Sequence, residues 1–122
     1  MVEMIPVKNE KLIAYRVEGE VTERDFDEVA TALEQKLETA DAVRVYAEIP
    51  LMEGITMEAL VADLAFGAKH ARDIGKFERV AVVTREDWIS KLAEIEGKAL
   101  PNVDVKAFPV EERERAMAWA LS

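Results

Sequence analysis

The sequence contains no cysteine and a single histidine, His70. The absence of cysteine excludes disulfide bonds, thiol nucleophiles and thiolate metal sites. A lone histidine also excludes metal sites that need several imidazole ligands. We therefore expect neither a metal centre nor a cofactor in this protein.

Long hydrophobic runs are absent as well. The opening segment, MVEMIPVKNEK, lacks the apolar stretch of a signal peptide. All hydrophobic stretches fall far short of the ~20 residues that span a bilayer. These absences predict a cytoplasmic protein, which would meet a membrane only as a peripheral protein.

Basic residues are scarce relative to acidic ones. The chain has 25 acidic and 16 basic residues, and its formal net charge is −9. Because such a balance repels phosphate groups, we expect no nucleic-acid partner and no purely electrostatic docking on anionic lipid. An acidic excess also keeps a protein soluble, which is the simpler explanation of this charge.

What is present favours one globular domain. Of the 122 residues, 50% are hydrophobic and 34% are charged, a composition typical of folded chains. No internal repeat, low-complexity tract or linker divides the sequence. We expect a single domain over residues 1–122, long enough to bury a core of its own.

Five segments rich in β-branched and apolar residues are predicted to be strands. They are residues 2–7, 11–18, 42–49, 79–83 and 103–108. Asn9 lies between the first two segments, which indicates a β-hairpin, and Gly19 interrupts the chain after it. The run RVAVV at 79–83 is apolar throughout, as in a central parallel strand that is covered on both faces.

Helices are predicted between the later strands. Thr22, with Asp25 three residues on, resembles a capping box and begins the first helix. Its apolar residues recur at helical spacing and form one stripe: Phe26, Val29, Ala30, Leu33 and Leu37.

Three further helices follow the same logic. Thr56 begins a second helix that runs to about Ile74 and is ended by Gly75. Thr84 begins a third, closed by Gly97 and Pro101. Pro109 opens the last one, in which EERER at 111–115 is interpreted as a solvated first turn. The order β-β-α-β-α-β-α-β-α predicts the α/β class, with a mixed, mostly parallel sheet and one antiparallel edge.

The segment 50–57, PLMEGITM, is predicted to be a loop, and it is more apolar than most loops. Ligands of open α/β sheets bind outside the carboxyl ends of the parallel strands. This segment leaves one such end, and the chain from Thr84 to Trp88 leaves another. If those strands are neighbours, a crevice suited to a hydrophobic small molecule lies between the two segments. The candidate ligand-binding residues are Leu51, Met52, Ile55, Thr56, Met57 and Trp88. Alternatively, the loop folds down onto the core.

The second predicted helix has an apolar stripe for the core and, on another side, an aromatic ring among small residues. Such a face suits contact with a second copy of the chain. The candidate interface residues are Ala59, Ala62, Phe66 and His70. Alternatively, Phe66 bends to the rim of its own core. Asp63 and Asp73 lie near His70 in the helix, but no nucleophile is implied beside it, so we expect no catalytic residue and a protein that is not an enzyme.

The element order and several segments together resemble the STAS fold of anti-sigma-factor antagonists, in particular its divergent SpoIIAA-like branch. The resemblance covers nearly the whole chain. It is carried by Gly19, Thr22, Asp25-Phe26, DLAFGAKH at 63–70, RVAVV at 79–83, Trp88, Phe108 and Ala118-Trp119.

Members of the classical branch switch partners through a phosphorylated serine in an Asp-Ser motif at the start of the second helix. Here the corresponding segment, residues 52–57, has no serine, and Thr56 has no aspartate before it. The resemblance thus implies a binding module without the phosphorylation switch. Two hypotheses follow: a module for an apolar or lipid-like ligand or a membrane surface, and a regulatory module that binds a protein partner, each compatible with a homodimer.

Overall fold

The chain opens with a β-hairpin, as predicted. Strands β1 (Val2–Ile5) and β2 (Leu12–Val17) pair in antiparallel fashion. Asn9 shapes the turn, because its side-chain Oδ1 accepts from the N–H of Lys11 at 2.8 Å.

In this computed structural model the described residues are 1–50, 52–55, 66, 69, 71–87, 89–91, 93–94 and 103–122. For residues 52–55, 71–72 and 74 the description covers the backbone alone.

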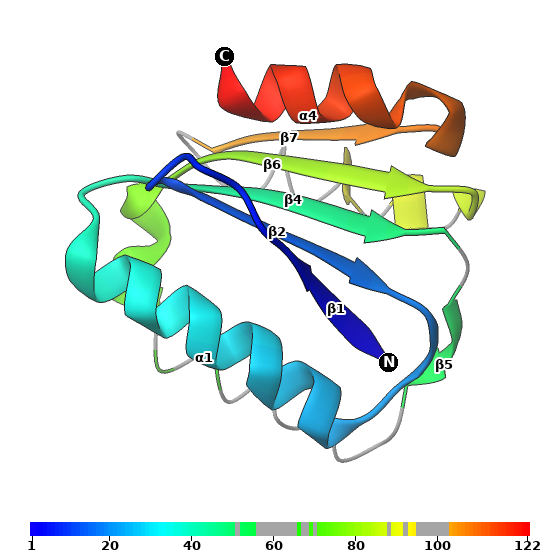
Figure 1. The fold of residues 1–122 in the computed structure, drawn as a ribbon, viewed down its shortest axis with the longest axis horizontal. Helices are drawn as coiled ribbons and strands as arrows, with labels where there is room; N and C mark the ends of the chain where they lie inside the picture. Colours follow the sequence, from blue (N-terminus) through cyan, green and yellow to red (C-terminus); the bar gives the residue numbers. More distant parts are fainter. Residues whose placement is uncertain are drawn as a thin grey trace.

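Four strands form the parallel part of the main sheet. After β2 come β4 (Val43–Ile49), β6 (Phe77–Thr84) and β7 (Asp104–Phe108), in the spatial order β1-β2-β4-β6-β7. Each parallel strand after β2 therefore pairs with the parallel strand that precedes it in the main sheet, and β1 supplies the antiparallel edge (Figure 1). The predicted α/β class and mostly parallel sheet are confirmed.

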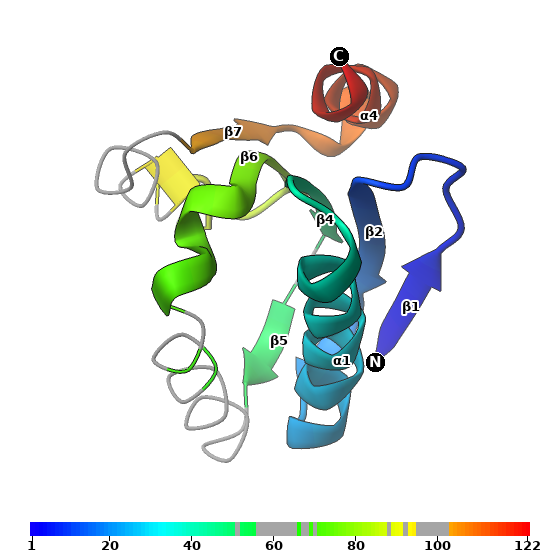
Figure 2. The same cartoon turned by 90° about the vertical axis from the view of Figure 1, so that its left-hand side faces the viewer.

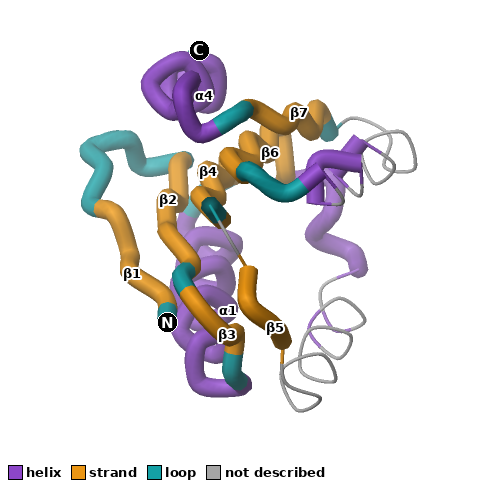
Figure 3. The backbone as a smooth tube through the Cα atoms, turned by 90° about the vertical axis from the view of Figure 1, so that its right-hand side faces the viewer, coloured by secondary structure: helices purple, strands orange, loops and turns teal. Residues whose placement is uncertain are grey.

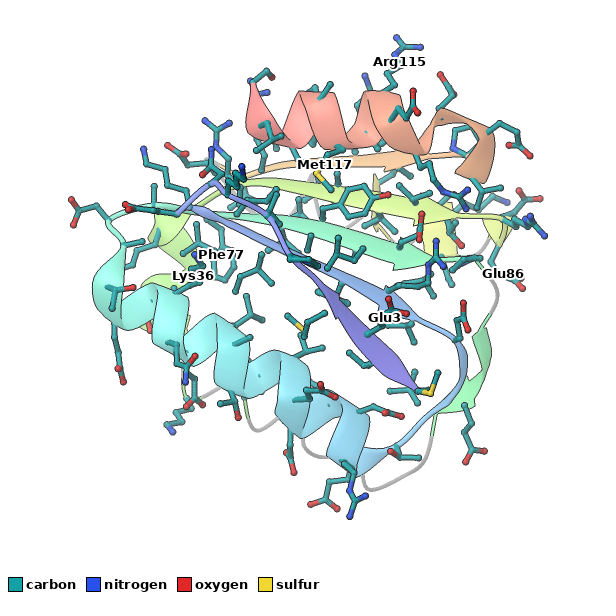
Figure 4. All side chains as sticks on the ribbon, in the orientation of Figure 1. Glu3, Lys36, Phe77, Glu86, Arg115 and Met117 are labelled. Atoms are coloured by element: carbon teal, nitrogen blue, oxygen red, sulfur yellow. The ribbon has the colours of Figure 1, made fainter. Side chains whose placement is uncertain are left out.

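Helices cover both faces of this sheet. Helix α1 (Glu23–Thr39) lies on one face, and α4 (Arg113–Leu121) lies on the other (Figures 1 and 2). Buried Ile89 and Ala93, from the helical segment after β6, pack on Val82 on the α1 side. The faces follow from the two-residue period of a strand: Val45 of β4 packs with Leu37 of α1, whereas Tyr46 packs with the α4 cluster. In Figure 4, Met117 points from α4 toward the sheet and Arg115 points away from it.

A complete capping box starts α1, as the sequence predicts. The backbone N–H of Asp25 donates to the hydroxyl of Thr22 at 3.3 Å, and the N–H of Thr22 donates to the Asp25 carboxylate at 3.0 Å. These two bonds satisfy donors that a helix start leaves unpaired.

Replacing Thr22 by alanine should lower the free energy of unfolding by about 1 kcal/mol, because the cap on the Asp25 N–H is lost. Urea denaturation monitored by circular dichroism measures the change. Thr31→Ala is the matched control, since Thr31 is exposed in the middle of the same helix and should cost nothing. An equal loss in both variants would show that the cap is not the cause.

The loop predicted over residues 50–57 is wrong at residues 52–55, which form a strand of a second, two-stranded sheet. Strand β5 (Met52–Ile55) lies within that segment and pairs in parallel with β3 (Gly19–Val21), as Figure 3 shows. Gly19 has a φ of 70°, a conformation that glycine adopts without strain, so the chain turns out of β2 at this point. Strand β3 therefore lies outside the main sheet and pairs with β5. Pro50 and Gly54 are typical of turns, and they indicated a loop where the structure has a strand.

Two predicted boundaries also require correction. Gly75 does not end the second helix: it lies inside a 3₁₀ helix, η1 (Ala71–Lys76), which leads directly into β6. The EERER segment is not simply a solvated turn. Its first acids belong to a 3₁₀ helix, η2 (Val110–Glu112), and Arg113 binds a buried carboxylate of the sheet.

Two arginines on strands hold the end of α4. Arg44 donates through Nη1 to the carbonyl oxygens of Ala120 and Ser122, at 3.0 and 2.6 Å. Arg79 donates to the carbonyl of Trp119 at 2.7 Å, and its guanidinium carbon lies 5.1 Å from the centre of that indole ring. Because the last carbonyls of a helix carry partial negative charge, these cations stabilise this end of α4.

Candidate ligand-binding site

The carboxyl ends of β4 and β6 lie side by side, as the predicted crevice requires. The two strands pair as far as Ile49 and Thr84. Beyond them, the N–H of Arg85 donates to the carbonyl oxygen of Pro50 at 3.2 Å, so the two outgoing segments touch. The hydroxyl of Thr84 accepts from the N–H of Glu86 at 3.0 Å, as expected for a residue just before a helix.

The predicted ligand-binding side chains themselves lie outside the described residues. Met52 and Ile55 are described as backbone positions of β5. The others are not among the described positions: Leu51, Thr56, Met57 and Trp88. Their role in ligand binding stays a prediction.

Next to this edge, the described residues line a partly open, largely apolar cavity of about 240 Å³ between α1 and the sheet, which we call the α1 pocket. Strands β2 and β4 contribute Val17 and Ile49 at their carboxyl ends, and α1 contributes Phe26, Val29 and Leu33. The stripe predicted to face the core therefore lines this pocket as well as the core. The apolar stripe of α1 was the sequence signal for this wall of the pocket. The spacing of those residues could not show that packing leaves a cavity between α1 and the sheet.

Phe66 closes one side of the α1 pocket. Its ring meets the ring of Phe26 edge to face, with centroids 5.9 Å apart and an interplanar angle of 83°, a favoured aromatic geometry. This contact within one chain agrees with the alternative in which Phe66 packs at the rim of its own core. The interface role of Phe66 stays a prediction, as do those of the undescribed Ala59, Ala62 and His70.

Asp25 is the one charged residue in the described lining of the α1 pocket. Its side chain is only 13% exposed. The hydrogen bond from the Thr22 backbone lowers the pKa of Asp25 and outweighs the opposite effect of burial. The carboxylate is therefore ionised at neutral pH, and it lies 3.3 Å from the ammonium group of Met1.

A larger hollow of about 580 Å³ lies between α1 and the hairpin, but it suits a ligand less well. Its α1 wall is polar and includes Gln35, Lys36 and Glu38. Ligand sites are concave and mostly apolar with a few polar groups, so the smaller α1 pocket is the better candidate.

The sequence-based reading missed a buried carboxylate on the opposite face of the sheet. Glu48, near the carboxyl end of β4, is 1% exposed. Its two oxygens bind the Nε atoms of Arg16 and Arg113, the second at 2.6 Å, and the hydroxyl of Tyr46 donates to it at 3.2 Å. We call these four residues the Glu48 cluster.

Electrostatics in the Glu48 cluster follow from burial and pairing. Burial by itself raises the pKa of Glu48, but the hydrogen bonds from Arg16 and Arg113 outweigh it, so the pKa lies below its ordinary value. Burial, together with the charge of Glu48, raises the pKa of Tyr46 to about 12. Since both oxygens of Glu48 accept from arginines, this carboxylate is poorly placed to act as a general base. It is better suited to anchoring Arg113 at the start of α4.

A signal for the Glu48 cluster was present in the sequence. Glu48 is an acid inside a segment predicted to be a buried strand, where an unpaired charge is too costly. Its partner Arg16 stands directly opposite it on β2, but that pairing becomes visible only once the strand register is known.

The described part of the chain contains no group of three or more acidic or histidine side chains that could hold a metal ion. Among the same residues, no helix is both long enough and apolar enough to cross a membrane.

Known proteins resemble this chain in sequence and in fold. A family model described as SpoIIAA-like matches residues 12–121. The crystal structure of an uncharacterized protein from Shewanella loihica PV-4, of the DUF3478 family and with a SpoIIAA-like fold, superposes with a TM-score of 0.71 at 21% identity. That likeness covers 98% of this chain and 92% of the other, and at this identity it shows the fold. None of the curated proteins matches the chain.

Proposed function

Because the chain belongs to the SpoIIAA-like family, we propose that it is a non-enzymatic binding module whose α1 pocket takes a small apolar ligand. The observation that carries this proposal is the cavity of about 240 Å³ beside the carboxyl edge of the sheet, with its largely apolar walls. Apolar cavities bind apolar molecules, and each buried CH₂ of a ligand contributes about 0.8 kcal/mol.

Incubating the purified protein with a total lipid extract should leave a small apolar molecule bound, and native mass spectrometry would identify it. Val29→Trp should abolish retention, because Val29 lines the pocket and the indole fills it. Glu28→Trp is the matched control, since Glu28 is exposed on the same helix and should keep the ligand. Absence of any retained molecule on the folded wild-type protein would contradict the proposal.

In a second form of this proposal, the same edge of the sheet binds a lipid surface and not a single ligand. The apolar segment 50–57 follows β4 at the same edge as the α1 pocket, so it would enter the interfacial layer of a membrane. Co-flotation with neutral phosphatidylcholine vesicles tests this directly. Met52→Asp should abolish flotation, and a wild-type protein that stays with the bottom fraction would exclude this form.

A second candidate function, supported by family membership, is a regulatory module that binds a protein partner. Residues 12–121 match a family named after an anti-sigma-factor antagonist. A pull-down with the wild-type chain, followed by mass spectrometry, distinguishes the two candidates. A stoichiometric kinase-like or sigma-factor partner, together with no retained small molecule, would favour the regulatory module.

A further inference from the structure

We infer that the α1 pocket selects compact, uncharged molecules and rejects carboxylates such as fatty acids. The inference rests on the proposed function and adds the chemical class of the ligand. It depends on three features of the pocket: the charge of Asp25, the occupied donors at the start of α1, and the volume of the cavity.

The charge in the pocket is negative. Among the described residues that line the pocket, only Asp25 is charged; it is ionised and its side chain is 13% exposed. The ammonium group of Met1 lies 3.3 Å from this carboxylate, but Met1 is 79% exposed and is not among those lining residues. A ligand carboxylate placed near Asp25 is repelled more strongly than it would be in water, because the surroundings screen less. The net charge of −9 adds to this repulsion.

The start of a helix usually attracts anions, but at α1 the chain supplies its own. Free N–H groups and the helix dipole favour a negative charge there. In α1, the hydroxyl of Thr22 occupies the N–H of Asp25, and the carboxylate of Asp25 occupies the N–H of Thr22. An anionic ligand that bound at these two N–H groups would have to displace the Thr22 hydroxyl or the Asp25 carboxylate, whereas an uncharged ligand elsewhere in the pocket leaves both bonds intact.

The volume limits the size of the part of a ligand that the pocket can bury. An apolar cavity of about 150 Å³ holds one benzene molecule, so a cavity of about 240 Å³ holds roughly ten carbon atoms on the same scale. The edge-to-face pair of Phe26 and Phe66 supplies one wall, and Tyr15 contributes a third ring to the lining. Aromatic walls favour a planar ring system, which stacks or meets them edge to face.

Isothermal titration with three probes tests the inference: 2-naphthol, 2-naphthoate and dodecanoate, at pH 7.5. The first two share a ring system of the right size and differ in charge. We expect 2-naphthol to bind at least about tenfold more tightly than 2-naphthoate, because the carboxylate meets Asp25. Dodecanoate, with its longer chain and its charge, should bind more weakly than 2-naphthol.

Two charge variants locate the cause of this preference. Asp25→Asn keeps a side-chain oxygen for the N–H of Thr22 but removes the charge, so the tenfold preference should shrink to about threefold or less. Glu28→Gln removes an equal charge from an exposed position of the same helix and should leave the preference unchanged.

The outcomes separate the inference from the proposed function. Equal binding of 2-naphthoate and 2-naphthol to the wild-type protein would overturn the charge selection while leaving an apolar binding module intact. Tighter binding of dodecanoate than of 2-naphthol would overturn the size limit in the same way. Binding of none of the probes, combined with no retained molecule from a lipid extract, would overturn both the inference and the proposed function.

Discussion

Replacing both Arg16 and Arg113 by methionine should lower the free energy of unfolding by about 3–5 kcal/mol at neutral pH, the usual cost of leaving one member of a buried ion pair without partners. Glu48 is buried, and these arginines bind its two oxygens. Methionine preserves the apolar stems of the side chains, so the loss is that of the charges. Either single substitution leaves one arginine in place and should cost much less.

The contribution of Glu48 to the pH dependence of stability should change sign in the double variant. In the wild-type protein the pKa of Glu48 lies below its ordinary value, so its contribution is present above the unfolded-state pKa and is lost as the pH falls through the folded-state pKa. Without the arginines, burial raises the pKa of Glu48 above that of the unfolded chain. The double variant should then lose stability as the pH rises above about 4.5.

Urea denaturation between pH 4 and pH 8 measures this reversal. Adding Glu48→Gln to the double variant is the control. A neutral amide in place of the buried carboxylate should recover part of the free energy of unfolding, and residue 48 should then contribute nothing to the pH dependence. If the double variant kept the wild-type slope, Glu48 would not be the group responsible.

Phe108→Ala should cost about 3–5 kcal/mol, the range for removing a large aromatic side chain from a packed core. Phe108 is 4% exposed at the end of β7 and lies 5.8 Å from the ring of Trp119, centroid to centroid. It belongs to the cluster beneath α4, so its truncation leaves a cavity and loosens that helix. Thermal denaturation should show a clearly lower midpoint.

Phe26→Ala is the matched comparison on the other face of the sheet. Phe26 is half-buried and already borders the α1 pocket, so its removal enlarges an existing cavity and should cost about 1–2 kcal/mol, because partly exposed atoms contribute less transfer free energy. A similar loss from both variants would mean that the α1 face is packed as tightly as the α4 face, and the pocket would be closed in solution.

Most of the fold could be predicted because its signals are local. Asn9 in the turn, the Thr22–Asp25 cap and the apolar run of β6 all depend on neighbouring residues. The pairing of β3 with β5 could not be predicted, because Gly19 and Met52 are far apart in the sequence and lie side by side only in the folded chain. The glycine at 75 suggested the end of a helix, but it lies inside η1, which leads directly into β6.

Part of the wall of the α1 pocket could be predicted, but the pocket is not the crevice that the sequence predicted, whose ligand-binding residues stay a prediction. The carboxyl edge of β4 follows from the parallel topology, and the apolar stripe of α1 points to its inner wall. The volume of the cavity depends on the distance between α1 and the sheet, and the spacing of apolar residues in the sequence does not predict that distance. The Glu48 cluster joins residues 16, 48 and 113, and their separation in sequence concealed it.

The succession of strands in the main sheet bears on how a nascent chain folds as it leaves the ribosome. Since β2, β4, β6 and β7 pair each with the one synthesised before it, the sheet can grow in step with translation, and Arg16 can meet Glu48 early. Helix α4 follows all of these strands, so the surface around Tyr46 stays open until α4 emerges. During that interval the unfinished sheet presents an apolar face to holdase chaperones and to other nascent chains.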